Sequence, residues 1–354
     1  MANDLLDVHV ILDVASPAQP VNLGNLAIFI VQTGTNEVIA DTTVSTFQEI
    51  TDRGLTLGAE ATQIAKGFFA QQEHGQTLFI YGVPKSTDGS ATTKKLETAL
   101  GDGWEFGAIV PSTQNDIVAM SNAIEAYGRK FLVVSGTGFD GAPAGAITAL
   151  EAVKNAPFYG NARTFMIGGV DAEQNYNIGA FVGAVGNKTP GSATWKFKSL
   201  TGSTAIKANG SVVSIATKNN VNLYVVKAGK DQTSEGLTLG GDYIDALLGD
   251  DWVRATLETN IQNLLQSVDK LSYDMTGIAQ LEAAVTTVLR QATDNGIILV
   301  NPETGAGQFT VTAQTRDQQA AADISSRKYN GLSFTYTRAG AIHDVTIHGT
   351  IGDI

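Results

Sequence analysis

A glycine-rich turn is the part of the sequence that most closely matches a ligand-binding motif. Gly136-Thr137-Gly138-Phe139-Asp140-Gly141 follows the apolar run 131–134 and precedes a predicted helix. In that context, backbone amides and a helix N-terminus can hold a pyrophosphate. About twenty residues downstream, where an acid should bind the ribose, stands Phe158-Tyr159-Gly160-Asn161, which has no carboxylate. A strand-to-helix turn that needs a positive φ is the simpler interpretation, and a nucleotide or small-ligand site at Gly136–Gly141 is the alternative.

The histidines are not spaced as metal ligands. They are His9, His74, His343 and His348. None belongs to an HExxH pair, and His343 and His348 would point to opposite sides of a strand because their separation is odd. Cys is absent, and neither a GxSxG nor a GxxxxGK[ST] motif occurs. We therefore expect no catalytic residue, no cofactor and no metal site, and a protein that is not an enzyme.

Charge and hydropathy limit the partners of the chain. Its 354 residues, 43% of them apolar, are enough for two domains with hydrophobic cores. A formal net charge of −12 disfavours contact with nucleic-acid phosphates or anionic lipid. The chain has no basic segment ahead of an apolar run and no apolar stretch of about 18–20 residues. We expect a soluble protein made in the cytoplasm, without nucleic-acid binding or membrane insertion.

The first half of the chain alternates apolar runs with helical patterns. The apolar runs are 26–31, 78–83, 106–110, 131–134 and 165–170. The helical stretches are near 58–73, 91–101, 114–128 and 142–154. Strands that alternate with helices predict βα units and a mostly parallel sheet covered on both faces.

The second half has a different pattern, which begins after the turn at 186–191. Its longest helical pattern spans 242–272, and a shorter one spans 276–293. Trp195-Lys196-Phe197-Lys198 alternates like an amphipathic strand. Further runs with β character are 296–300, 308–315 and 332–338. This half is predicted to be α+β.

Both ends of the chain alternate as half-buried strands do. The apolar positions are Val8, Val10, Leu12 and Val14 at one end, and Val345, Ile347 and Ile351 at the other. Breakers flank them, with Pro17 and Pro20 after the first and Arg338-Ala339-Gly340 before the last. Such ends either pair within their own subunit or add a strand to a sheet of a neighbour. The residues alone leave both alternatives open.

Several segments of the second half together resemble the contractile tail sheath family. In chain order they are Pro190–Phe197, Lys218–Val225, Glu235-Gly236, Gly240–Asp245, Asp251-Trp252 and Leu271–Ile278. The resemblance covers roughly residues 186–354 and is strongest to phage and prophage sheath-like proteins. The order of the segments is more specific than any one of them. The first half is similar only as an α/β domain of the kind that such proteins have outside their conserved domain.

The resemblance implies an architecture and a function. It implies an N-terminal arm over 1–20, an outer α/β domain over 21–185, a conserved sheath domain over 186–340 with long helices and a mixed sheet, and a C-terminal arm over 341–354. Sheath subunits form stacked hexameric rings around an inner tube, and the rings contract to drive the tube through a cell envelope. The implied partners are copies of the chain, the tail tube protein, and baseplate and terminator proteins. The implied location is a virion tail or phage-tail-like particle.

The resemblance also favours exchange of the two arms between subunits. Charged residues of the long helix are candidates for facing the tube. They are Asp250, Asp251, Arg254, Glu258, Asp269 and Lys270. A capsid or surface-layer component is the other assembling protein that the sequence leaves open.

Overall fold

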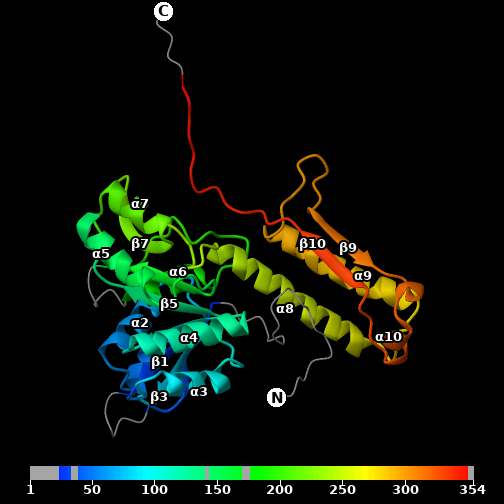
Figure 1. Ribbon diagram of the computed structural model, residues 1–354, viewed down its shortest axis with the longest axis horizontal. Coiled ribbons are helices and arrows are strands. Elements are labelled where there is room, and N and C mark those ends of the chain that lie inside the picture. Colours follow the sequence, from blue (N-terminus) through cyan, green and yellow to red (C-terminus); the bar gives the residue numbers. More distant parts are fainter. Residues whose placement is uncertain (1–23, 33–38, 140–142, 170–175, 350–354) are drawn as a thin grey trace, which may run out of the picture.

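The computed structural model describes residues 24–32, 39–139, 143–169 and 176–349. They form an α/β body and a smaller C-terminal module, which the long helix α8 (Ile244–Ser267) joins (Figure 1). We use "C-terminal module" for residues 275–338. Of the described helices, none is long and apolar enough to cross a membrane.

An eight-stranded mixed sheet forms the centre of the body. Its order is β2-β3-β1-β4-β5-β6-β7-β8. The six inner strands are parallel, and the edge strands β2 and β8 are antiparallel to their neighbours. The bounds are β1 Leu26–Val31, β2 Thr42–Val44, β3 Leu78–Val83, β4 Phe106–Val110, β5 Phe131–Gly136, β6 Thr164–Gly168, β7 Val221–Lys227 and β8 Lys230–Thr233.

Helices cover both faces of this sheet, which explains the continuous apolar strands. Every residue of β1 is buried, as expected for a parallel strand packed on both sides. One face packs against α1 (Phe47–Asp52), α2 (Ala59–Phe69) and α6 (Tyr176–Val185). The other packs against α3 (Ser90–Ala99), α4 (Gln114–Tyr127), α5 (Pro143–Lys154) and α7 (Gly210–Lys218).

Glycines allow α2 and α6 to pack very closely. A Cβ added at Gly67 would approach the carbonyl oxygen of Tyr176 to 2.2 Å, and one at Gly179 would approach that of Ile64 to 1.9 Å. Neither position has room for a side chain, so the two helices depend on glycine where they cross.

The C-terminal module has its own small core. Helix α9 (Met275–Asp294) packs against α8, and the hairpin of β9 (Phe309–Ala313) and β10 (Leu332–Tyr336) lies on these helices. A 3₁₀ turn (Arg316–Gln318) and the short helix α10 (Ala321–Ser325) join the two strands. Alternate residues of each strand face the helices, so one face of the hairpin is apolar and the other is exposed.

The structure confirms a mixed α/β fold with a large mixed sheet, and it corrects three local predictions. The long helix ends at Ser267 rather than near 272, because the chain becomes extended at Val268. The 296–300 run forms isolated bridges instead of a strand. Trp195–Lys198 is not a strand either, because Phe197 has a φ of 66°.

The predicted domain boundaries stay predictions. Strands β7 and β8 lie beyond residue 185 and still extend the sheet of the body. The predicted N-terminal strand, with Val8, Val10, Leu12 and Val14, lies outside the described residues, as does Ile351.

Candidate functional site

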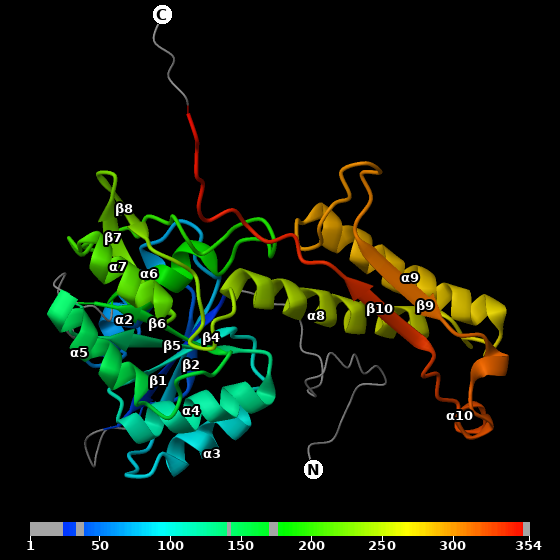
Figure 2. The same cartoon turned by 45° about the horizontal axis from the view of Figure 1, so that its top comes forward.

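The most exposed apolar residues of the molecule include three near its C-terminal end. Residues 341–349, which we call the C-terminal segment, run away from both the body and the module (Figures 1 and 2). No helix or strand is assigned to these nine residues. Ile342, Val345 and Ile347 are 80%, 70% and 87% exposed. In this described part of the C-terminal arm, pairing within a sheet of the same subunit is therefore not observed.

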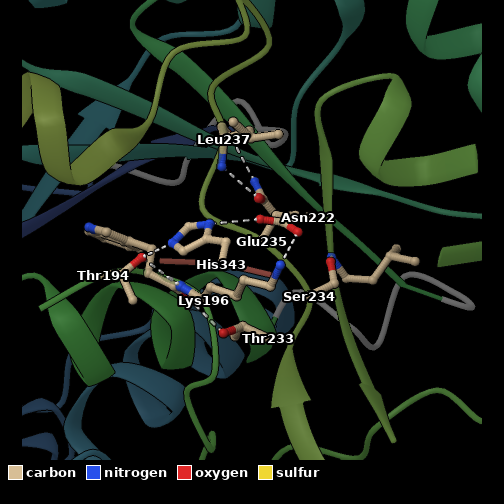
Figure 3. A network of polar contacts seen from close by, with 10 residues as sticks. Thr194, Lys196, Asn222, Thr233, Ser234, Glu235, Leu237 and His343 are labelled. Carbon is tan, nitrogen blue, oxygen red and sulfur yellow. Dashed lines mark hydrogen bonds and ion pairs between the residues drawn. The ribbon is translucent and has the colours of Figure 1, made fainter. Parts of the chain in front are cut away.

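A polar network fixes the point at which this segment leaves the molecule (Figure 3). The Nδ1 atom of His343 lies 3.1 Å from Glu235 Oε2, and its Nε2 atom lies 2.7 Å from Thr194 Oγ1. The other carboxylate oxygen of Glu235 accepts a hydrogen bond from Lys196, and both of these residues are buried. We call Thr194, Lys196, Glu235 and His343 the His343 network. In this network, both carboxylate oxygens of the buried Glu235 have a polar partner. Such pairing is required because burial of an unpaired charge is costly.

Aromatic rings add to the polar contacts of His343. The imidazole lies edge-on to Tyr243 at 5.0 Å and to Phe197 at 6.1 Å between ring centroids. Both aromatic residues are also partly exposed, at 44% and 49%. The base of the C-terminal segment is thus a small surface of aromatic rings around a fixed imidazole.

Buried polar side chains of the hairpin β7–β8 position the network. Asn222 of β7 donates to the carbonyl oxygens of Met166 (2.9 Å) and Leu237 (2.8 Å) and accepts from the Leu237 N–H (2.8 Å). Thr233 of β8 donates to the carbonyl of Trp195 at 2.7 Å. These bonds hold the chain on either side of Glu235 against residues 194–198. Three of the segments that resemble sheath proteins, around Trp195, Asn222 and Glu235, therefore meet here.

A second carboxyl group lies near the network, at the start of α8. Burial raises the pKa of Asp245, while nearby His343 and Thr194 act in the opposite direction. Within the described ranges, His, Asp and Glu side chains form no group of three that could hold a metal ion. The arrangement favours a structural attachment point.

Buried ion pairs join the first half of α8 to the amino ends of the central strands. Arg129, just before β5, makes two hydrogen bonds to Glu258, of 3.0 and 2.8 Å. Arg163, just before β6, pairs with both oxygens of Asp251, one at 2.9 Å. Bidentate pairs of this kind fix both distance and orientation. They determine the direction in which α8 leaves the body.

Glu105 and Lys130 are two further buried charges beside these pairs. Burial, and then the charge of Asp251, raise the pKa of Glu105 to about 8. Its Oε1 atom has no hydrogen-bond partner among the described residues. Burial lowers the pKa of Lys130 to about 8, against the opposing effect of Glu105. Lys130 donates to the carbonyls of Asp102 (2.8 Å) and Trp104.

The six residues predicted to face a tube do not share one surface. Asp251, Arg254 and Glu258 are only 8%, 3% and 2% exposed, because this face of α8 packs against the body. These three therefore lie inside the molecule, which corrects the expectation that they form an outer face.

The other three candidates are more accessible. Asp250 accepts hydrogen bonds from Tyr336 (2.5 Å) and Arg338, which tie α8 to β10 and the residues after it. Asp269 and Lys270 follow the end of α8 and are exposed. Contact of these residues with a tube stays a prediction.

The glycine-rich turn is filled by an aromatic ring in its described part. Gly138 has a φ of 87°, which agrees with the simpler interpretation of the motif. Phe139 is fully buried, and a Cβ on Gly136 or Gly168 would come within 3.2 or 2.8 Å of its ring. The ring takes up the space between the ends of β5 and β6. A pyrophosphate would have to enter this space to reach the backbone amides of the turn. Asp140 and Gly141 lie outside the described residues.

Sequence reasoning did not find the His343 network. Its members stand in three separate segments, and His343 was considered only as a possible metal ligand. A usable signal existed, because Thr194 and Lys196, and also Glu235, fall in segments that resemble sheath proteins.

Comparison with known proteins confirms the resemblance. Residues 244–351 match the model of the C-terminal domain of tail sheath proteins like gp31 of E217. A search of curated protein sequences found no match.

Solved structures match the whole chain in fold. A chain from the baseplate of the anti-feeding prophage has a TM-score of 0.68 at 13% identity, and the match covers 98% of this chain and 99% of that one. A chain from the contracted helical sheath of the same particle has a TM-score of 0.66 at 14% identity, covering 97% and 98%. The sheath tail protein of Listeria innocua has a TM-score of 0.56 at 10% identity, covering 92% and 97%. The chain therefore has the fold of contractile sheath proteins over nearly its full length.

Proposed function

We propose that this chain is the structural subunit of a contractile tail sheath. Copies would polymerise as stacked hexameric rings around an inner tube, and contraction of the rings would drive the tube through a cell envelope. The observation that supports this most is the C-terminal segment, which is fixed at His343 and exposes Val345 and Ile347 away from its own body. A segment built in this way is suited to complete a sheet of another subunit.

The hairpin β9–β10 offers a place for strands from neighbouring subunits. It has two strands, with an apolar face on α8 and α9. Two-stranded sheets are marginally stable alone, and their edges have backbone groups available for further pairing. In our proposal, the C-terminal arm of one neighbour and residues 1–20 of another add strands to this hairpin. Arm exchange would then keep subunits connected through contraction.

The energy for contraction would be stored when the sheath assembles. If the contracted lattice buries more apolar and hydrogen-bonded surface than the extended one, contraction proceeds downhill without nucleotide hydrolysis. The long helix α8 and its buried ion pairs would transmit motion between body and module as one unit. Our remaining candidates for contact with the tube are Asp250 of α8 and the exposed Asp269 and Lys270 past its end.

The partners follow from this function. Similar folds occur in a sheath and in a baseplate of phage-tail-like particles, which supports self-assembly and association with a baseplate. We propose an inner tail tube protein and a terminator protein as further partners. The subunit would be made in the cytoplasm of a bacterial host and function in a virion tail or phage-tail-like particle.

Electron microscopy of two truncated proteins tests the proposal. Deletion of residues 342–354, or separately of 1–15, should leave a folded monomer that does not form tubes. Deletion of 352–354 alone is the control and should retain assembly, because it keeps Val345, Ile347 and Ile351. Circular dichroism and size-exclusion chromatography verify folding.

Three outcomes would contradict parts of this proposal. Tubes formed by either large deletion would disprove exchange of that arm. Flat sheets or closed shells from the full-length chain would instead favour a surface-layer or capsid component. A full-length chain that stays monomeric with its tube protein at high concentration would disprove the sheath function.

A further inference from the structure

Two exposed aromatic residues lie at the base of the C-terminal segment, beside the ring of His343. Phe197 and Tyr243 are 49% and 44% exposed, and each lies edge-on to the imidazole, at 6.1 and 5.0 Å between ring centroids. Ile342, which precedes His343, is 80% exposed. We call Phe197, Tyr243 and Ile342 the base patch. Aromatic side chains that cluster on a surface in this way are typical of protein–protein interfaces.

The backbone at Phe197 has a conformation that is unfavourable for a bulky residue. Its φ of 66° lies in the left-handed region, where phenylalanine is an outlier. Hydrogen bonds to one residue of β8 maintain this conformation. The Phe197 N–H donates to the Thr233 carbonyl at 3.1 Å, and the Lys198 N–H donates to Thr233 Oγ1 at 2.9 Å. The side chain nevertheless remains half exposed, so burial in the subunit core does not account for a phenylalanine at this position.

Tyr243 is similarly unsuited to its position. It is the N-cap residue of α8, and its side chain makes no capping hydrogen bond. Ser, Thr, Asp and Asn are preferred at an N-cap because their side chains accept a hydrogen bond from the first turn. Tyrosine therefore contributes less to the start of this helix than serine would. Contact with another molecule explains both aromatic residues better than local structure does.

The short chain that follows His343 identifies this other molecule. His343 is held to its own subunit by Glu235 and Thr194. In the proposed sheath, Val345 is already part of a strand in a sheet of a neighbour. Two residues of extended chain span at most about 7 Å. The sheet that accepts the arm must therefore lie directly beside the base patch.

We propose that the base patch packs against the C-terminal module of the neighbour that accepts the arm. Two residues of the module, Leu299 and Val300, are the expected contacts because they are apolar and 36% and 44% exposed. They lie beside the hairpin β9–β10. The Leu299 N–H donates to the Thr337 carbonyl at 2.8 Å, and the Leu299 carbonyl accepts from the Gln308 N–H at 2.7 Å.

The contact rests on the proposed function and gives it a further geometric element. An exchanged strand alone connects two subunits through a short single chain, and rotation about the backbone dihedrals of that chain changes their relative orientation. Packing of the base patch on the neighbour's module joins two folded surfaces. It would therefore fix the orientation in which the arm passes from one subunit to the next.

Substitutions that suit the local backbone test the base patch. Asn tolerates a positive φ and Ser is a preferred N-cap residue, so Phe197→Asn/Tyr243→Ser should change the melting temperature little. Light scattering and electron microscopy should nevertheless show that this variant needs an about ten-fold or higher protein concentration to form tubes. A purely structural role of the two residues would instead lower the melting temperature and leave assembly unchanged.

Two further variants provide the control and test the partner surface. Ile147→Ala is the control, because Ile147 is 48% exposed but lies on α5 of the body. It should assemble as the wild type does. Val300→Ser changes the partner surface and should impair assembly in the same sense as Phe197→Asn/Tyr243→Ser. Circular dichroism verifies that each variant is folded.

Photo-crosslinking identifies the partner directly and keeps an aromatic side chain in place. The amino acid p-benzoylphenylalanine replaces Phe197 or Tyr243, and tubes are assembled from a mixture of isotopically light and heavy subunits. Mass spectrometry should detect cross-links from one copy to the residues around Leu299 and Val300 of another copy. Cross-links to another body, to residues 1–20 or to the tube protein would disprove the contact, as would the absence of cross-links between copies.

The outcomes separate this contact from the sheath proposal. If wild-type tubes form and Phe197→Asn/Tyr243→Ser assembles like Ile147→Ala, only the contact of the base patch is disproved, whether both variants assemble normally or both are impaired. If the wild type forms no tubes, the sheath function fails. Cross-links between copies in concentrated solution then decide on the contact, and their absence would disprove it as well.

Discussion

His343 brings together three segments that are far apart in the sequence. Its two ring nitrogens contact Glu235 and Thr194, and its ring packs on Tyr243 and Phe197. The Thr194 hydroxyl can donate or accept, so both nitrogens remain paired whether or not the imidazole is protonated. The residue is therefore suited to hold the start of the C-terminal segment.

Replacement of His343 by Ala should free this segment without unfolding the body. Glu235 keeps its contact with Lys196, so we expect a loss of unfolding free energy of about 1–2 kcal/mol. Hydrogen exchange of the backbone around residues 339–345 should become faster. His348→Ala is the control, because His348 is exposed in the same segment. Equal exchange in the two variants would show that the His343 network does not hold the segment.

Glu105 should make the stability of the protein fall as pH rises. The folded state raises the pKa of this carboxyl group from 4.5 to about 8. Between these values, the folded state keeps a proton that the unfolded state has lost, so the free energy of unfolding decreases with increasing pH. Glu105→Gln removes the titration. Relative to the wild type, it should gain about 1 kcal/mol or more between about pH 5 and 8.

Urea unfolding at a series of pH values measures this difference. Glu97→Gln, at an exposed position of α3, is the control and should follow the wild type. Parallel stability curves for Glu105→Gln and the wild type across this range would contradict the raised pKa.

At the scale of elements, the sequence predicted the main helices and strands but not where their charges lie. Continuous apolar runs located β1 and β3 to β6, because burial on both faces of a sheet requires them. The periodicity of apolar residues also located α8. Periodicity identifies the apolar face of a helix, but it does not identify the partners of the charged residues. The partners of Asp251 and Glu258 lie 88 and 129 residues away in the chain, and no local pattern reveals them.

Trp195 shows why a short alternating pattern is ambiguous. The pattern around it predicted a strand, but the indole packs against Phe106, Phe165 and Phe181 at 5.4, 5.5 and 5.0 Å between ring centroids. This tertiary packing, with a positive φ at Phe197, determines the local backbone. Parts of the candidate site that depend on such long-range packing could not be predicted from the sequence.

The pair Arg129–Glu258 provides a test of how α8 is held. Glu258→Ala leaves Arg129 buried without its bidentate partner, and should lower the free energy of unfolding by about 3–5 kcal/mol. Arg129→Met/Glu258→Leu removes both charges and should recover much of that loss. Urea unfolding measures both, together with Arg129→Met and Glu258→Leu, the two single variants that complete a double-mutant cycle. Losses that simply add would show that the two residues act independently.

At the scale of the molecule, folding and assembly use different apolar surfaces. The body and the C-terminal module bury their own cores. The C-terminal segment instead runs away from the body (Figure 2), and its residues Ile342, Val345 and Ile347 are exposed. Substitutions in the segment should therefore affect assembly while leaving the folded subunit intact. This separation allows the two properties to be measured in the same variants.

Replacement of Val345 and Ile347 by Ser applies this reasoning directly. These side chains are 70% and 87% exposed in the subunit, so the melting temperature should not change measurably. If the segment adds a strand to a neighbour, both residues become buried on one face of that sheet, and tube formation should be lost or need far more protein. Thr346→Ser/His348→Ser changes the opposite face and should assemble normally. Equal assembly of the two double variants would mean that this face is not buried between subunits.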